Sequence, residues 1–434
     1  GTSGGSTGST TGSTTGTTGA SGATGGTTGG TTGGATGGTT GSATGSTLFT
    51  TSENRIGITP TTLRMCGHAA LIYAKAFQTD VKDLNVFWDA LNDEKGGIYG
   101  RKVEMSYVDD QYKPDVAVQA AKTCVAKDIF MLLGGIGFDQ IPAVRNYVEQ
   151  AHVLYLHHTA TVQGSKGLKY SFTELPSVER LGSGFAQLAQ QKYKGKRIGI
   201  LKRDSTNWEP GIQAFKALGK IYGLNIVAEE KAAASAGSYA AQIQNLKNAT
   251  AEVVFIWLNA LESFEAAKQM HTARFNPNIL AFPFNLTSQS LMSESVDPVM
   301  EGVAMYPAYS NGDYSGPFAS YADDMKEFER QYAKYDGGAA GPDLSSVAGD
   351  LLFLNWVAQK ALYKQLLLCG RDCTRNRFVD VLQGYHAIPT SSACPIDFRR
   401  GDGHHGADNV TFMQTYLAPD GKYNWRETRH CVAP

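Results

Sequence analysis

Residues 93–104 read DEKGGIYGRKVE and lead, through an Asp-Asp pair at 109–110, into PDVAVQAA at 114–121. The paired glycines at 96–97 are typical of a helix end, and the alternation in 102–108 predicts a strand. The proline that opens the last stretch suits the first turn of a second helix, because the backbone N–H that proline lacks would have no partner within the helix there. The stretch therefore indicates helices on either side of a strand, as in an α/β fold.

The same alternation of short apolar runs and helical periods extends in both directions from this stretch. It predicts an α/β protein with doubly wound, mostly parallel sheets, which bind ligands beyond the carboxyl ends of their strands. We expect strands at 55–59, 102–108, 129–133, 153–156, 170–173, 197–201, 225–227, 253–257, 279–283 and 302–306, helices at 67–94, 114–127, 139–150, 178–191, 208–222, 239–248, 261–273, 318–335, 345–368 and 374–382, and a closing hairpin of 410–416 and 421–425.

Composition separates an N-terminal tail from the part that folds. Residues 1–47 contain Gly, Thr, Ser and Ala alone. They offer no apolar area to offset the entropy of ordering, so we expect a flexible tether with a span of roughly 35–40 Å. The rest is long enough for two lobes. The net charge of −1, without a basic face, disfavours nucleic acid as a partner.

The quoted stretch resembles the opening of type I periplasmic binding proteins of the leucine/isoleucine/valine-binding kind. The likeness continues through Gly-Gly-Ile-Gly at 134–137, RIGIL at 197–201, WEPG at 208–211 and APDGKY at 418–423, and so covers nearly all of residues 54–434. It implies a two-lobed clamshell that closes on a small solute and passes it to an ABC permease, without catalysis and without a cofactor. It places the lobes at 54–173 plus 309–393 and at 174–308 plus 394–434.

The resemblance also implies which residues contact the ligand. In the first lobe these belong to two loops after predicted strands. A glycine-rich turn offers amides to a carboxylate, and a second loop matches the family at two threonines but departs from it at His157 and His158, of which we expect one in the cleft. In the second lobe the expected contacts are a tryptophan, which could equally be a core residue, and three polar side chains. A tyrosine lies at the second crossover of the chain between the lobes. The expected ligand-binding residues are Ile136, Gly137, Phe138, His158, Thr159, Thr161, Trp208, Asn259, Asn285, Thr287 and Tyr309.

The loop 284–288 (FNLTS) lacks the carboxylate with which amino-acid binders of this kind pair the ligand ammonium. The substitutes are Glu174, Glu179, Asp204 and Glu262. A buried amine without a carboxylate partner is costly. The absence therefore counts against an α-amino acid. Hydrophobic amino acids stay in the expected set, and aromatic or aliphatic carboxylates and small amides stay open as ligands.

Six cysteines allow fifteen complete pairings. We expect disulfides Cys66–Cys124, Cys369–Cys373 and Cys394–Cys431, each within one lobe, which leaves the hinge free. The four-residue spacing of the second pair is not that of a redox Cys-x-x-Cys motif, and its position between two helices favours a small structural bridge.

Other chemistry finds little support in the sequence. Gly-Ser-Gly at 182–184 lies in a helical pattern and lacks the spacing of a nucleophile elbow. No further Cys or His lies near His404 and His405 at the spacing of metal ligands, so we expect a solvent-exposed loop.

We therefore expect a monomeric, extracytoplasmic solute-binding protein, tethered by its tail after a lipid-modified cysteine. The alternatives are a sensor of the same fold that reports to a receptor and, far behind, an enzyme with His157 or His158 as base.

Overall fold

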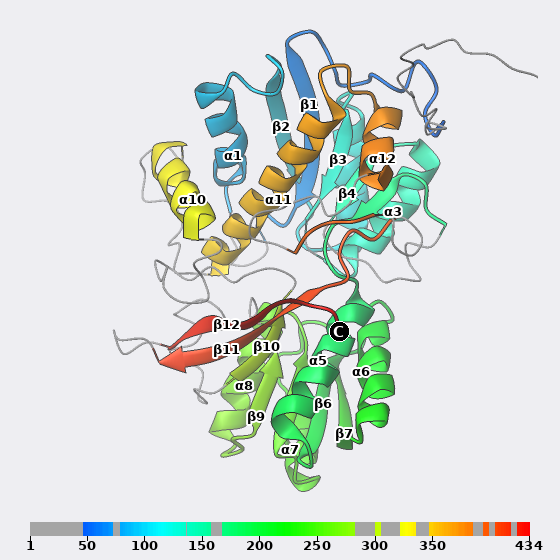
Figure 1. Cartoon of the computed structure of the whole chain (residues 1–434). Helices are drawn as coiled ribbons and strands as arrows, with labels where there is room; N and C mark the ends of the chain where they lie inside the picture. The colour runs from blue at the N-terminus through cyan, green and yellow to red at the C-terminus, as the bar shows by residue number, and fades with distance from the viewer. Residues whose placement is uncertain are drawn as a thin grey trace, which may run out of the picture. The chain divides into compact units, whose positions relative to one another are not determined.

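The computed structural model describes residues 47–72, 79–135, 137–157, 167–282, 300–304, 322–335, 347–384, 394–398, 404–417 and 423–434. All of them belong to one compact unit, Gly45–Pro434. Figure 1 shows two β-sheets in this unit, with helices packed against each. No helix in the described part of the chain combines the length and apolarity needed to span a bilayer.

The first sheet is parallel throughout, with strand order β2-β1-β3-β4-β5. Its strands are β1 (Thr62–Ala69), β2 (Lys102–Asp109), β3 (Met131–Gly134), β4 (Tyr155–His157) and β5 (Ser171–Thr173). Parallel neighbours need crossover connections, and α1 (Val81–Glu94), α2 (Pro114–Val125) and α3 (Gln140–Ala151) supply them. A capping box between Asp80 and Asp83 starts α1, and Pro114 lies in the first turn of α2.

Three helices from much later in the chain complete this part of the fold: α10 (Ala322–Tyr335), α11 (Val347–Cys369) and α12 (Arg375–Gly384). Both α10 and α11 pack against α1, and α12 packs against α11. In Figure 1, α11 is the long orange helix that crosses the face of the first sheet. A segment distant in sequence therefore forms a wall beside the ends of the first strands.

The second sheet has the order β12-β11-β10-β9-β8-β6-β7 and is parallel except at β11 and β12. Its strands are β6 (Arg197–Arg203), β7 (Asn225–Ala232), β8 (Val253–Trp257), β9 (Asn278–Ala281), β10 (Met300–Ala304), β11 (Val410–Leu417) and β12 (Tyr423–Val432). Its helices are α5 (Val178–Tyr193), α6 (Glu209–Tyr222), α7 (Ala240–Asn248) and α8 (Ala260–Thr272). The predicted α/β class with mostly parallel sheets is confirmed.

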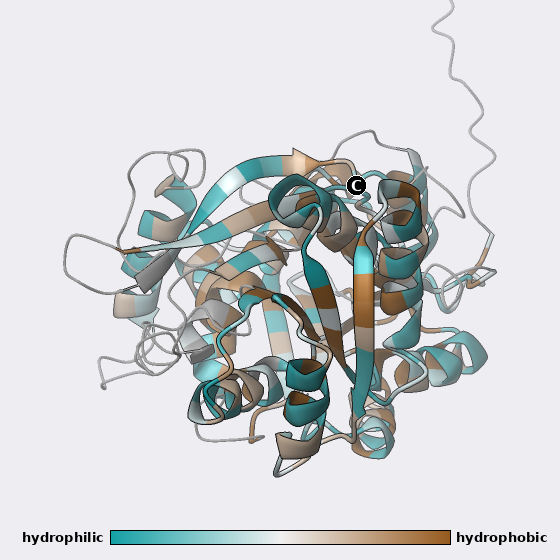
Figure 2. Cartoon of the chain, turned by 90° about the horizontal axis from the view of Figure 1, so that it is seen from below, coloured by the Kyte–Doolittle hydropathy of each residue, from teal (hydrophilic) through white to brown (hydrophobic). Residues whose placement is uncertain are grey.

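The core of the second sheet is built around β8, all five residues of which are buried. Phe255 and Trp257 pack with Phe185 of α5 at ring-centroid distances of 4.7 and 6.1 Å. Figure 2 shows the hydrophobic residues gathered along strands and on the inward sides of helices. Helices α5 and α6 approach closely at Gly182, where a Cβ would collide with the backbone of Gly211. This contact explains why glycine stands at position 182.

The prediction for the start of the fold was wrong. Residues 55–59 form turns and a single bridge from Ile58 to Leu63, and the first strand is Thr62–Ala69, part of which had been assigned to a helix. Helix α1 begins at Val81. The strand is central in its sheet, between β2 and β3, so pairing on both edges overrides the weak local preference of TLRMCGHA.

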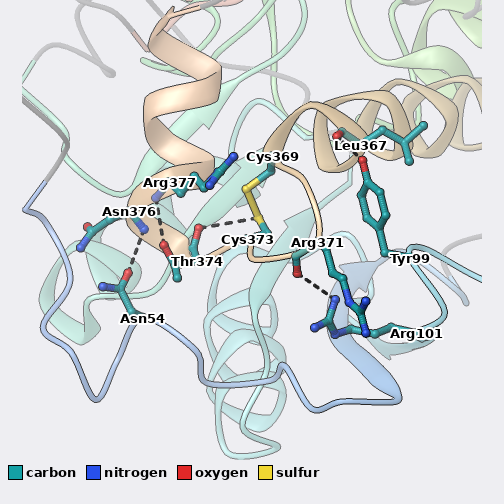
Figure 3. Close-up of a disulfide and its surroundings, with 10 residues drawn as sticks. All are labelled: Asn54, Tyr99, Arg101, Leu367, Cys369, Arg371, Cys373, Thr374, Asn376 and Arg377. Atoms are coloured by element: carbon teal, nitrogen blue, oxygen red, sulfur yellow. Dashed lines mark hydrogen bonds between the residues drawn. A yellow bond between two sulfur atoms is a disulfide. The ribbon is translucent and has the colours of Figure 1, made fainter. Parts of the chain in front are cut away.

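The three expected disulfides, Cys66–Cys124, Cys369–Cys373 and Cys394–Cys431, are confirmed. The first joins β1 to α2 and the second closes the end of α11, as Figure 3 shows. Around that second bridge, Tyr99 donates to the carbonyl of Leu367 at 2.8 Å and Arg101 to that of Arg371 at 2.9 Å. These bonds hold the carboxyl end of α11 against the loop before β2.

Candidate functional site

A cavity of about 150 Å³ lies at the carboxyl ends of strands β1 and β3. His68 and Ala69 line it from β1, and Gly134 and Gly135 line it from the end of β3. Its apolar wall comes mainly from leucines of the first sheet, α1 and α11: Leu84, Leu133, Leu156, Leu351, Leu354 and Leu362. Trp208 and Asn259 line it from loops of the second sheet. Both sheets therefore contribute side chains to one cavity.

One end of the cavity is fixed by a buried polar chain. The His68 Nδ1 lies 2.8 Å from Asp110 Oδ2, and its Nε2 lies 2.6 Å from the hydroxyl of Tyr155. All three residues are buried. Burial raises the pKa of Tyr155, so its hydroxyl keeps its proton. Both ring nitrogens of His68 are thus engaged by the protein, and the ring acts as a rigid wall.

Glu174 lies in the segment that leaves β5, and its side chain is buried where it lines the cavity. Its amide donates to the carbonyl of His157 at 2.9 Å, and its Oε1 accepts from Gln365 of α11 at 3.3 Å. Burial raises the pKa of Glu174 to about 8, against the smaller opposing effect of Gln365. The group is therefore mostly an uncharged acid at neutral pH, able both to donate and to accept.

Two amide side chains of α11 also line the cavity and hold its wall in place. The Nε2 of Gln359 donates to the carbonyl of Leu84 at 2.7 Å and to the hydroxyl of Tyr107 at 2.8 Å. Asn355 donates to the same carbonyl at 3.0 Å. The buried Oε1 of Gln359 has no hydrogen-bond partner among the described residues. Such an atom is costly unless a ligand or water supplies a donor.

Phe138 and Trp208 join the cavity to the core of the second sheet. Their rings meet edge to face, with centroids 4.5 Å apart, and both line the cavity. The carbonyl of Trp208 accepts from the indole of Trp257 at 2.9 Å. The buried indole nitrogen of Trp208 has no partner within the described ranges. Trp208 is thus a core residue and a cavity residue at once.

A polar contact lies beside this aromatic pair. The carboxylate of Asp139, in the loop after β3, accepts from the hydroxyl of Ser205 at 2.8 Å and from Asn207 at 3.0 Å, both in the loop after β6. Arg203 lies 3.6 Å from its other oxygen. The contact connects the loop after β3 in the first sheet to the loop after β6 in the second sheet.

The structure brings together three of the predicted ligand-binding residues, since Phe138, Trp208 and Asn259 all line the cavity. Asn259 also caps α8, accepting from the amide of Glu262 at 2.9 Å. The carbonyl of Gly137 accepts from Ile141 in the first turn of α3. The other predicted residues, Ile136, His158, Thr159, Thr161, Asn285, Thr287 and Tyr309, lie outside the described residues. A ligand-binding role for all of these residues stays a prediction.

The wall formed by α11 had not been predicted. Its lining residues include Leu351, Asn355, Ala358 and Leu362, which recur at three to four positions and so share one helix face. That spacing was visible in the sequence, but nothing local showed that the face would reach the ends of β1 and β3. Glu174 had been named as one of four possible carboxylates, without a reason to prefer it.

The expectation of a solvent-exposed loop at His404 and His405 was wrong. Both side chains are buried. The Nδ1 of His404 donates to the carbonyl of Ser171 at 2.7 Å, its ring packs against Phe172 with centroids 4.5 Å apart, and His405 forms a bridge with Thr173. Across the described ranges, no group of three or more His, Cys, Asp or Glu side chains could hold a metal ion. The two histidines extend the edge of the first sheet.

Comparisons with known proteins agree with the fold. A model of the periplasmic binding protein family matches residues 76–421. The Leu/Ile/Val-binding protein BraC3 of Rhizobium johnstonii is 24% identical over 47% of this chain and 54% of its own length. The chain spans about half the length of the curated relatives it matches, 54% and 51%.

Two solved structures share the fold. A solute-binding protein of an ABC transporter from R. palustris, in complex with 4-hydroxybenzoate, has a TM-score of 0.68 at 16% identity and covers 86% of this chain and 98% of its own. A fatty acid ABC transporter substrate-binding protein from Thermomonospora curvata has a TM-score of 0.68 at 14% identity and covers 88% and 95%.

Proposed function

Because this chain belongs to the periplasmic binding protein family, we propose that it captures a small solute in the cavity and delivers it to an ABC importer. The observation that carries the proposal is the position of the cavity. It lies at the carboxyl ends of parallel strands and takes lining residues from both sheets, which is where open α/β sheets bind ligands. Binding and release, without a chemical step, are its proposed activity.

Capture requires that the two halves move relative to each other. We place the lobes at 54–173 plus 309–393 and 174–308 plus 394–434. Contacts between loops of the two sheets support the proposed movement. Ser205 and Asn207 donate hydrogen bonds to Asp139, and Phe138 packs on Trp208. These interactions stabilise a closed arrangement, and hinge closure on a ligand follows if they break and re-form together.

The proposed solute is a branched-chain or other hydrophobic amino acid, or a related carboxylate or amide. A leucine-rich wall favours an apolar body, and the polar residues at the ends of the strands suit a hydrogen-bonding group. The named relatives bind, by their descriptions, Leu/Ile/Val, 4-hydroxybenzoate or fatty acids. We propose that the chain acts as a monomer outside the cytoplasm, with residues 1–47 as a tether to the membrane surface or cell envelope, near its permease.

A thermal-unfolding screen of hydrophobic amino acids, aromatic acids and amides tests the proposal. A solute at a hundred times its Kd should add about 2.7 kcal/mol to the unfolding free energy. The cavity-lining Ala358→Trp should remove this stabilisation. The matched change Ala241→Trp, on the exposed surface of α7, should keep it. Equal responses in both variants would contradict the site, and loss of this chain should abolish uptake of the identified solute by cells.

A further inference from the structure

The size and lining of the cavity limit the body of the solute. Its volume of about 150 Å³ is on the order of an apolar cavity that admits a benzene molecule. Leu351, Leu354 and Leu362 of α11 line it together with Leu84 and Leu133. A single aromatic ring, or an aliphatic group of that size, can therefore fill the cavity and pack against the leucines of α11.

The polar groups of the described lining residues restrict the charge that the solute can carry. Among its described lining residues there is no Lys or Arg, and the ring of His68 is held by Asp110 and Tyr155. Burial raises the pKa of Glu174 to about 8, so pairing with an ammonium group would first require a buried acid to ionise. A carboxylate, in turn, would meet no cationic side chain from these residues, and an unpaired charge in such a place is costly.

Two buried polar atoms of the lining residues have no hydrogen-bond partner in the described part of the chain. The indole nitrogen of Trp208 needs an acceptor, and the Oε1 of Gln359 needs a donor, since neither has a partner among the described residues. A carboxamide offers both an acceptor and a donor, and a hydroxyl does the same with one oxygen. Neither group brings a charge into the cavity.

Building on the proposed function, we propose that the solute is an uncharged carboxamide or alcohol with a ring-sized apolar body. The body lies along the leucine face of α11, and the polar group hydrogen bonds with Trp208, Gln359 and Glu174. Within the wider set of solutes given under the proposed function, this favours the amides, and amino acids and carboxylates, which carry a charge at this position, are the weaker ligands.

Titration calorimetry at pH 6.5 with benzamide, benzyl alcohol, benzoate and benzylamine tests this inference on the full chain. These four probes share the ring and differ in the polar group. We expect benzamide and benzyl alcohol to bind at least about tenfold more tightly than the charged pair. Tighter binding of benzoate or benzylamine would overturn the inference.

Two pairs of variants locate the solute. Trp208→Phe should weaken benzamide about three- to tenfold by removing one hydrogen-bond donor. Trp88→Phe makes the same change at a buried indole of α1 that is not among the lining residues, and should not weaken it. Ala358→Leu should weaken benzamide about tenfold by filling the space beside α11, whereas Ala241→Leu on exposed α7 should leave it unchanged.

The outcomes separate this inference from the proposed function. If none of the four probes binds while another solute of the wider screen does, the ring-sized neutral class is wrong and solute capture stands. If no solute binds in either experiment, the proposed function itself fails. Equal effects of Trp208→Phe and Trp88→Phe would also overturn the assigned contact.

Discussion

Replacing Glu174 with Gln should stabilise the ligand-free protein, and increasingly so as the pH rises. The folded-state pKa of about 8 lies roughly 3.5 pH units above the ordinary value of 4.5. Below pH 4.5 the acid is protonated in both states and contributes nothing. Between 4.5 and about 8 the unfolded chain loses the proton and the folded protein keeps it, so stability falls with pH. At about 1.4 kcal/mol per pH unit, the full cost is about 5 kcal/mol.

The glutamine variant avoids this cost because its side chain cannot ionise. Urea unfolding at pH 5, 6, 7, 8 and 9 should give a stability difference from the wild type that grows to several kcal/mol and levels off above pH 8. Glu104→Gln is the control for loss of a carboxylate, because Glu104 is half exposed and pairs with Arg64 on the surface. A difference for Glu174→Gln that stayed constant from pH 5 to 9 would refute the burial argument.

Four further changes test the packing that surrounds the cavity. Trp208→Ala should cost the ligand-free protein about 3–5 kcal/mol in urea unfolding, since the side chain is buried in the aromatic core; no loss would mark Trp208 as a ligand contact alone. Replacing Cys66 and Cys124 with Ala should cost about 4 kcal/mol, because that bridge spans 58 residues, against about 2 kcal/mol for the four-residue bridge of Figure 3. Equal losses on thermal unfolding would contradict the loop-length argument. Gly182→Ala should lower stability by about 1–3 kcal/mol through its collision with α6, and a neutral result by calorimetry would show that α5 can move away. Asp139→Ala should cost about 1–3 kcal/mol, since it removes two hydrogen bonds to a carboxylate, and unchanged unfolding would show that the contact between the sheets is incidental.

Local patterns predicted most of the elements because each carries its own signal. The paired glycines after Glu94 end α1, Pro114 opens α2, and the apolar run of β8 is that of a strand buried on both faces. The first strand was missed because its residues alternate poorly and gain their stability from two neighbouring strands. His404 and His405 were missed for the same reason, since their partners lie more than 200 residues away in β5 and its flanks.

The resemblance to binding proteins led to Phe138, Trp208 and Asn259, all of which line the cavity. The sequence by itself determined the α/β class and the positions of most helices and strands. These properties depend on neighbours within one or two helical turns, which a periodic pattern records. The tertiary structure alone decided that α11 closes the cavity and that Glu174 is buried there as an uncharged acid. The burial of a side chain and the charges around it depend on which helices and strands pack together, and these can be hundreds of residues apart in the sequence. No local pattern specifies that packing.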